Sequence, residues 1–415
     1  MTILPALALL TFASTIVTAS SSVPIPPSRD PFYTAPDNFE NASPGDVLRV
    51  RIAPGDLISF VANTSQAYNI LFRTTDSHYQ PSWAVTTLFI PDARLKSTGD
   101  ALLSYQYPYN SPNIDESPSF AFHGGLNPSN SVLFTDVEWA LGRGYYVSVP
   151  DFEGPKAAFI AGVQEGHATL DSIRAVRSLS LGLKPDARTA LSGYSGGAFA
   201  SEYAAELQVQ YAPELQIAGV ALGGLVDNGT RAVDAVNGAP YAGLIPLGLL
   251  GLTAQYPEAR AYVLDQLHNS GPFNETNFLS SFNLTLVQIF GIFAKQTVFK
   301  YFKDGRDILY NPTLSKILSI ESTLGSHGVP QAPLFIYKAV HDEVTSIEGT
   351  NELVERYCEY GANIWYQRNT VGDHVEEHEN GKARTFQFLQ DVLEGNYSHH
   401  GCTVETVTVN VATNA

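Results

Sequence analysis

Positive charge is scarce in this chain, whose 415 residues include 24 Lys and Arg against 41 Asp and Glu. The net charge of −17 argues against nucleic acid as a partner, because binding to phosphates needs a basic surface. The sequence also lacks a cluster with the spacing of zinc ligands and a Gly-rich phosphate-binding loop. We therefore expect an acidic protein that uses no metal and no other cofactor.

Long apolar runs are missing as well, and beyond the first residues no uninterrupted apolar stretch could cross a bilayer. Residues 1–19 are typical of an export signal, because 4–16 are mostly apolar and 17–19 offer a small-residue cleavage site. A short membrane anchor is the alternative interpretation, but this run is too short and is broken by Pro5. The sequence predicts a secreted, extracellular protein with no transmembrane segment.

Cysteine is limited to two residues, and in an exported protein such a pair most simply forms one disulfide, here Cys358–Cys402. This bond would tie the tail that follows the last helix to the body, while two free buried thiols are the alternative. No motif around either cysteine supports a thiol nucleophile. Six sequons also suit the secretory pathway and predict glycosylation; they begin at Asn41, Asn63, Asn228, Asn274, Asn283 and Asn396.

One motif points to chemistry: Gly-Tyr-Ser-Gly-Gly at 193–197, between a short strand-compatible run and a helix-compatible segment at 198–207. A Gly-x-Ser-x-Gly sequence in this context is the nucleophile elbow of α/β-hydrolases, a turn so tight that small residues must flank the serine. We predict that Ser195 is a nucleophile and that the backbone N–H of Gly196 stabilises the oxyanion. A plain glycine turn is the alternative.

The order of predicted elements indicates the fold. Early β-prone runs at 47–52, 83–90 and 102–107 are expected to form the antiparallel margin of a mixed sheet. From about residue 131 helices and strands alternate, which is typical of a mostly parallel sheet with helices on both faces. The predicted elements are helices at 135–142, 158–181, 198–207, 348–360 and 384–393, and strands at 145–149, 189–191, 217–222, 333–339 and 363–368.

Residues 225–325 interrupt this alternation with mostly helical, strongly apolar sequence, such as 244–252. We interpret this stretch as a helical lid or cap inserted between two parts of an α/β core, 20–224 and 326–415. Such a cap would cover the strand ends and line an acyl-binding tunnel. An ordinary helical layer packed on the sheet is the alternative.

An activated serine needs a base and an acid that orients it, and in this fold the chain order is Ser, acid, His. The loop after strand 333–339 offers Asp342, with Glu343 as the rival acid. His374 follows strand 363–368 and is the predicted base, while His378, one helical turn later, is the alternative and is expected on the surface. Either acid could instead cap the helix that begins near Ser346.

Several separated blocks, in the right order, resemble the fungal secretory lipase family. The segment Asp151-Phe-Glu-Gly-Pro-Lys-Ala-Ala-Phe-Ile-Ala161, the elbow at 193–197 and Tyr211-Ala-Pro-Glu-Leu215 are similar to blocks of that family. Asp342-Glu343 and His374 fall where its acid and base lie, and Cys358 with 361–363 resembles the surroundings of a family disulfide whose other half is Cys402. The likeness covers most of the chain beyond residue 30.

The resemblance implies an α/β-hydrolase with a helical lid that cleaves carboxylic esters without a cofactor. In some members an acidic residue after an early strand supplies the second oxyanion donor; here the matching position is Asn110, with Asp115 further on. An amide also donates hydrogen bonds.

The first functional hypothesis is a secreted lipase that contacts a lipid interface transiently. The second is an esterase that deacetylates a bulky metabolite of the trichothecene type. The third is a non-catalytic secreted glycoprotein, which would normally lose one member of the triad.

Overall fold

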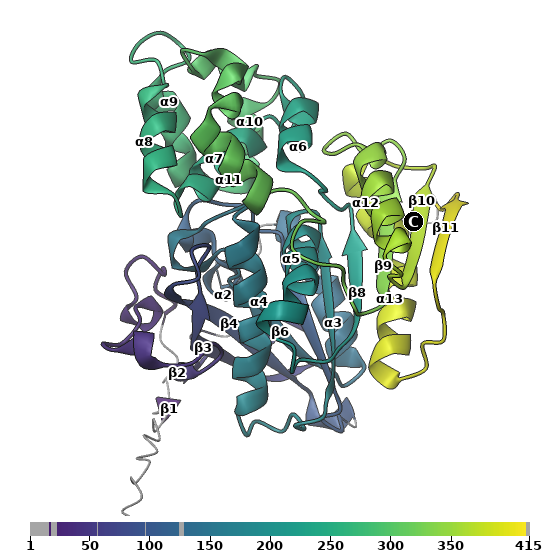
Figure 1. Cartoon of the computed structure of the whole chain (residues 1–415). Coiled ribbons are helices and arrows are strands. Elements are labelled where there is room, and N and C mark those ends of the chain that lie inside the picture. Colours follow the sequence, from purple (N-terminus) through teal and green to yellow (C-terminus); the bar gives the residue numbers. More distant parts are fainter. Residues whose placement is uncertain (1–15, 18–22, 56, 96, 124–127, 412–415) are drawn as a thin grey trace, which may run out of the picture.

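The computed structural model describes residues 16–17, 23–55, 57–95, 97–123 and 128–411, and one eleven-stranded sheet runs through these residues (Figure 1). The predicted export signal lies outside the described residues except for Ile16 and Val17. In spatial order the strands are β1 (Ile16–Val17), β2 (Val47–Ile52), β3 (Thr64–Thr75), β4 (Pro81–Pro91), β6 (Tyr146–Pro150), β5 (Ala101–Gln106), β7 (Arg188–Tyr194), β8 (Ile217–Gly223), β9 (Leu334–Ala339), β10 (Ile364–Asn369) and β11 (Cys402–Val407).

Strand direction divides the sheet into two regions. β2, β3, β4 and β6 pair antiparallel to their neighbours in turn, whereas all pairs from β6 through β11 are parallel. The prediction of a mostly parallel sheet with an antiparallel margin is therefore confirmed, but the placement of residues 102–107 in that margin is wrong. This strand, β5, lies between β6 and β7 and is parallel to both, and its fully buried side chains fit an internal position.

Besides the two-residue β1, which falls within the predicted export signal, two strands escaped prediction. β3 is twelve residues long, starts with polar residues and is almost continuously buried in its second half, so its sequence shows no regular alternation. β11 occupies what we expected to be a tail, pairs with β10 in parallel register and exposes most of its side chains. A strand with little burial carries no strong apolar pattern in its sequence.

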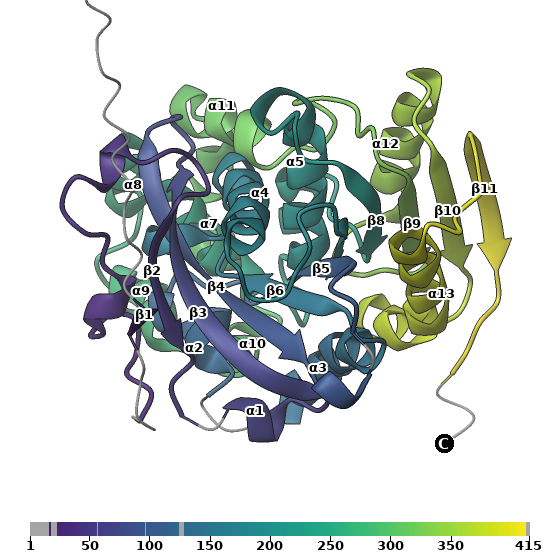
Figure 2. The same ribbon diagram turned by 90° about the horizontal axis from the view of Figure 1, so that it is seen from below.

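Helices cover both faces of the sheet (Figure 2). On one face lie α4 (Gly162–Ser178), α5 (Gly196–Tyr211) and α12 (Ile347–Glu359), and on the other lie α3 (Pro128–Gly142) and α13 (His374–Glu394). The short helices α1 (Leu57–Phe60) and α2 (Pro118–Ala121) lie near the antiparallel region. α13 begins ten residues before the predicted start at 384, so the predicted loop around His374 is in fact the first turn of a helix.

A separate group of helices stands above the carboxyl ends of the parallel strands (Figure 1). It comprises α6 (Gly229–Val236), α7 (Leu244–Thr253), α8 (Pro257–Asp265), α9 (Glu275–Leu279), α10 (Leu286–Phe293) and α11 (Pro312–Glu321). These helices, called the cap below, share their own cluster of buried apolar side chains, which also includes Phe159 and Val344 from the core. The cap therefore packs on the sheet end through apolar contacts.

The carboxyl-terminal edge of the sheet is linked covalently to a helix. Cys358 of α12 and Cys402 at the start of β11 form a disulfide with a Cα–Cα distance of 5.9 Å. The pairing predicted from the cysteine count is thus present, and the alternative of two free thiols is wrong. Among the described residues no helix is both long and apolar enough to span a bilayer.

Candidate active site

Ser195 lies at a sharp turn between β7 and α5. Its backbone has φ 55° and ψ −121°, a conformation that a non-glycine residue adopts only under strain and that the elbow motif requires. The turn also brings α5 against the end of β5, because a Cβ atom on Gly197 would lie only 1.9 Å from the backbone oxygen of Gln106. The sequence folds this way because small residues follow the serine.

The structure brings the three predicted triad residues together at the carboxyl ends of three strands. Nε2 of His374 lies 2.9 Å from Oγ of Ser195, and Nδ1 lies 2.8 Å from Oδ2 of Asp342. Asp342 follows β9 and His374 follows β10, in the expected chain order. These distances allow a proton to move from the serine to the imidazole while the carboxylate orients the ring.

The Asp342 carboxylate is buried and accepts several hydrogen bonds. Its Oδ1 accepts hydrogen bonds from the backbone N–H groups of Val344 and Thr345, each at 3.0 Å. Burial alone would raise the pKa of Asp342, but the Lys338 ammonium group and the His374 ring outweigh burial and hold this pKa below its ordinary value. Asp342 is therefore ionised throughout the range in which a histidine works as a base.

His374 is the first residue of α13, and three groups fix its main chain. The Asp373 side chain caps the helix by accepting from Val375 and Glu376. The backbone N–H of His374 donates to Oε2 of Glu343 at 2.9 Å, and the hydroxyl of Tyr194 donates to the His374 carbonyl at 2.5 Å. Glu343, the rival acid, thus contacts the main chain of the histidine and not its ring.

His378 does not reach the serine, and our expectation that it lies on the surface is wrong. It is 6% exposed and points toward Asp136, with Nε2 3.2 Å from Oδ2. Burial tends to lower the pKa of His378, but the hydrogen bonds to Asp136 and Glu379 outweigh it and raise this pKa. The helical spacing from His374 places His378 one turn deeper, beneath Tyr194.

Asn110, the predicted second oxyanion donor, lies next to Gly196. It follows β5, is 7% exposed and has φ 47°, and it lines the same cavity as Ser195 and Gly196. A Cβ atom on Gly196 would lie 2.1 Å from Oδ1 of Asn110, so the approach of this amide depends on glycine at 196. Asp115, the other sequence candidate, instead accepts hydrogen bonds from the backbone and hydroxyl of Ser28.

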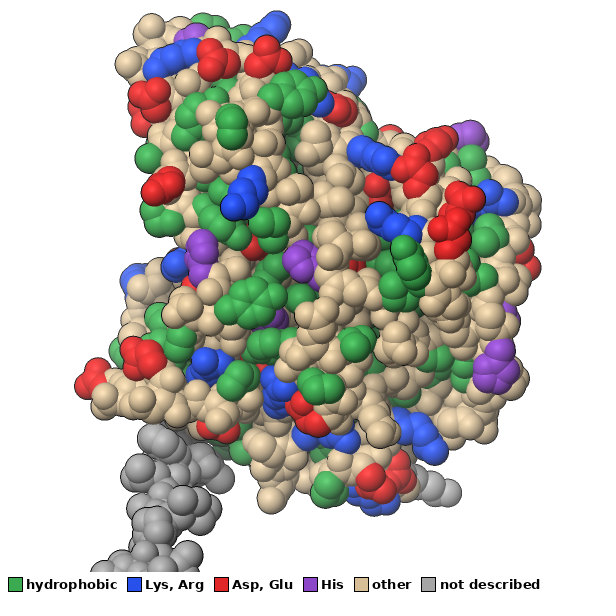
Figure 3. Space-filling model, in the orientation of Figure 1, with side chains coloured by type: hydrophobic (Ala, Val, Ile, Leu, Met, Phe, Trp, Pro, Cys, Tyr) green, Lys and Arg blue, Asp and Glu red, His purple; other side chains and the backbone are tan. Residues whose placement is uncertain are grey.

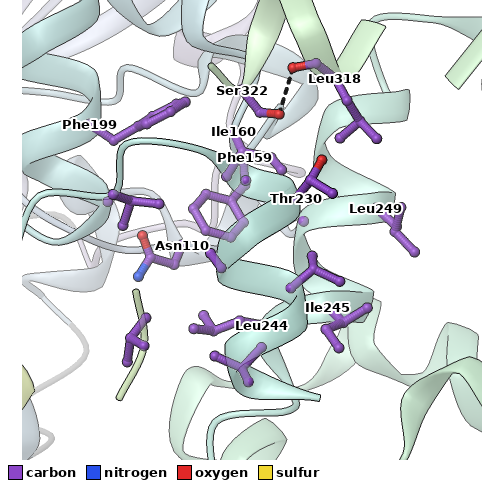
Figure 4. A pocket seen from close by; sticks show the side chains of 18 of the residues that line it. Asn110, Phe159, Ile160, Phe199, Thr230, Leu244, Ile245, Leu249, Leu318 and Ser322 are labelled. Atoms are coloured by element: carbon purple, nitrogen blue, oxygen red, sulfur yellow. Dashed lines mark hydrogen bonds between the residues drawn. The ribbon is translucent and has the colours of Figure 1, made fainter. Parts of the chain in front are cut away.

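An apolar cavity extends from Ser195 into the space beneath the cap (Figure 4). Its walls come from the loop before α4, from α6 and α7, and from α11. They include Phe159, Ile160, Leu244, Ile245, Leu249 and Leu318. Water makes few hydrogen bonds with such apolar walls, so the cavity suits the apolar part of a substrate.

Sequence reasoning missed the residues that support the triad. Lys338 lies inside a strand and belongs to no motif, and Tyr194 occupies the variable position of the elbow motif, which carries no information about its side chain. The one available signal was a lysine in the otherwise apolar strand Leu-Phe-Ile-Tyr-Lys-Ala, because a charge in a fully buried parallel strand needs a partner.

The six sequons differ in accessibility. Asn41, Asn63, Asn283 and Asn396 are exposed, whereas Asn228 and Asn274 are partly buried. The Asn228 amide is fully engaged: Oδ1 caps α6 by accepting from Thr230 and Arg231, and Nδ2 donates to Thr323. A glycan would attach to Nδ2 and crowd its contact with Thr323, whereas Oδ1 would remain able to cap α6.

Comparisons with known proteins agree on one family. A family model described as secretory lipase matches residues 132–401. The trichothecene C-3 esterase of Fusarium sporotrichioides is 49% identical, over 94% of this chain and 90% of its own length. A probable trichothecene esterase of Stachybotrys chartarum is 42% identical, over 94% and 82%. The crystal structure of Candida antarctica lipase A in its closed state superposes with a TM-score of 0.85 at 29% identity, covering 93% of this chain and 91% of that one.

Proposed function

This chain belongs to the secretory lipase family, has the α/β-hydrolase fold and is a carboxylic ester hydrolase, and from that premise we propose that Ser195, His374 and Asp342 carry out the hydrolysis. The observation that supports this assignment is the continuous hydrogen-bonded path from the Ser195 hydroxyl through the His374 ring to the Asp342 carboxylate, with separations of 2.9 and 2.8 Å.

The chemistry follows from these contacts. Nε2 of His374 takes the Ser195 proton as Oγ attacks the ester carbonyl, and the Asp342 carboxylate stabilises the imidazolium that forms. The backbone N–H of Gly196 and the side-chain amide of Asn110 donate to the oxyanion. The imidazolium then protonates the leaving alcohol, and a water molecule, activated by the same ring, releases the acid from Ser195.

For the substrate we propose a short acyl ester, such as an acetate, of a bulky multi-ring alcohol. The two relatives named as trichothecene esterases support this choice, since they match nearly the whole chain at 49% and 42% identity. The apolar walls beneath the cap would bury the rings of such an alcohol, and the cap, which we assign to residues 225–325, would then decide which alcohols fit.

A lipase is the second candidate. The apolar cavity at Ser195 also suits a long acyl chain, and Val287 and Ile292 of α10 are 52% and 51% exposed on the cap, where they could contact a lipid surface. Hydrophobic side chains lie among charged ones over the outer face of the cap (Figure 3). For either substrate we propose that the chain acts outside the cell, in keeping with the secretory family.

The test compares kcat/KM on three substrates: an acetylated trichothecene, p-nitrophenyl esters of increasing acyl length, and an emulsified triacylglycerol. We expect the acetylated trichothecene and p-nitrophenyl acetate to be preferred. A preference that rises with acyl length, together with activity on the emulsion, would establish the lipase instead. Ser195→Ala is the control for all three, and hydrolysis that survived this substitution would exclude Ser195 as the nucleophile.

A further inference from the structure

A lysine is buried directly behind the triad. Lys338 lies near the end of β9 with 0% exposure, and its Nζ donates to the backbone carbonyl of Leu225 at 2.8 Å. Nζ is also 3.2 Å from Oδ2 of Asp342, the oxygen that contacts the His374 ring at 2.8 Å. A single carboxylate oxygen therefore faces a lysine on one side and the catalytic imidazole on the other.

This arrangement places two cations in competition for one anion. The Asp342 carboxylate stabilises a positive charge on His374, but the same oxygen is already paired with the Lys338 ammonium group. Two positive charges near one carboxylate repel each other, and burial weakens the screening of this repulsion. The lysine therefore reduces the stabilisation that Asp342 can give to the imidazolium.

Nearby carboxylates favour the charged form of Lys338, whereas its burial disfavours that form. Burial lowers the pKa of Lys338, and the carboxylates of Asp342, Asp227 and Glu348 oppose this effect. Asp227 is itself paired with Arg231 at 3.4 Å. The other titratable groups that face Asp342 or the start of α13 are Tyr194 on β7, Tyr241 before α7, Glu343, Tyr366 on β10, Asp373 and Glu377.

We propose that Lys338 is a positioning residue of this active site: its ammonium group holds the Asp342 carboxylate in place and opposes protonation of His374, so that the base stays available in acidic surroundings. This inference rests on the proposed triad. It explains why a strand buried on both faces retains a lysine at this position. It also gives an exported acidic protein a hydrolytic site suited to low external pH.

The first experiment measures kcat/KM on an acetyl ester between about pH 4 and pH 8. The variants are Lys338→Met and Lys338→Gln; glutamine is one bond shorter than lysine, but it keeps a side-chain N–H donor and carries no charge. We expect the acidic limb of the profile to move to higher pH by about one unit in both variants, the size of effect that a neighbouring charge has. Lys338→Gln also serves if the methionine variant does not fold.

Lys382→Met is the matched control, because Lys382 lies on α13, the helix that His374 begins, but pairs with Asp136 and Glu379. Its profile is expected to coincide with that of the wild type. A purely structural role for Lys338 would lower kcat/KM equally at every pH and leave the limb in place. That result would overturn the proposal.

A second readout needs no substrate. NMR follows the ring signals of His374 through a pH titration, and these signals are assigned by their absence in His374→Gln. The titration is carried out on Ser195→Ala and on the double variant Ser195→Ala/Lys338→Gln. We expect the midpoint to lie higher when the lysine charge is removed, and equal midpoints would refute the proposal. Because this titration does not depend on hydrolysis, failure of the proposed function and failure of the role of Lys338 are distinguishable.

Discussion

The backbone N–H of His374 donates a 2.9 Å hydrogen bond to the carboxylate of Glu343, while the neighbouring Asp342 holds the imidazole ring at 2.8 Å. Two consecutive acidic residues thus contact the same histidine: Glu343 binds its main chain and Asp342 binds its side chain. The loop after β9 therefore sets both the position of His374 and the orientation of its ring.

Removing the Glu343 carboxylate should displace His374 without removing any reacting group. We expect Glu343→Ala to lower kcat by about 10-fold with little change in KM, because a small misplacement of a base is costly to the chemical step. Glu343→Gln keeps an acceptor oxygen and should retain most of the activity. Steady-state kinetics on one ester checks both variants.

Asp342→Asn is the contrasting substitution. An amide at this position cannot stabilise the imidazolium, and it favours the wrong tautomer of the ring, so we expect kcat to fall by roughly 10⁴-fold. If Glu343→Ala proved as damaging as Asp342→Asn, our assignment of the two acids would be wrong.

Asn110 is predicted to act on the oxyanion. Asn110→Ala should lower kcat by about 10²–10³-fold at nearly constant KM, which is the usual cost of losing one oxyanion donor. Asn110→Asp offers a sharper test, because a carboxyl group donates only while it is protonated. Its activity relative to the wild type should fall as the pH rises, and a ratio independent of pH would argue against donation from this side chain.

The elbow was the most predictable part of the site. Residues 193–197 fold as a local unit, since the size of the glycines alone decides how closely the turn can pack against β5. The positions of Asp342 and His374 followed from the rule that parallel strands end at one edge of a sheet. The chain order of strands and helices therefore sufficed to bring together residues that are 179 positions apart.

Other features depended on contacts that no local pattern encodes. The direction of β5 is set by its neighbours β6 and β7, and its sequence would suit either direction. The start of α13 was hidden because Asp373 and Gly372 resemble loop residues, although Asp373 is the helix cap. Lys338 could be recognised as unusual in a buried strand, but its partner Asp342 became evident only from the geometry.

Asp151 should make stability depend on pH. Burial raises the pKa of Asp151 to about 7, despite hydrogen bonds from the backbone and hydroxyl of Ser119 at 2.9 and 2.5 Å. Above the ordinary value of 3.8 the unfolded chain loses this proton while the folded chain keeps it. The free energy of unfolding should therefore decrease as the pH rises toward about 7 and then level off.

Asp151→Asn isolates this contribution, because the amide cannot ionise and its oxygen still accepts from the Ser119 backbone. Between about pH 5 and pH 7 the wild type should lose up to about 3 kcal/mol relative to the variant, at about 1.4 kcal/mol per pH unit. Urea unfolding of both proteins at several pH values measures the difference. Parallel curves would show that Asp151 keeps the same protonation state on unfolding.

The Cys358–Cys402 disulfide should stabilise the fold without affecting the chemistry. It closes a loop of 44 residues, for which the loss of chain entropy in the unfolded state corresponds to about 4 kcal/mol. We expect Cys358→Ser/Cys402→Ser to unfold at lower urea concentration than the wild type, by an amount close to that free energy. Addition of a reductant should lower the stability of the wild type and leave the double variant unchanged.

The disulfide joins α12 to the far edge of the sheet, whereas the triad lies at the ends of β7, β9 and β10. The kcat/KM of the double variant at low temperature should therefore remain within about 2-fold of the wild type. A large loss of activity in a variant that is still folded would mean that the β11 edge helps to position the start of α13, where His374 lies.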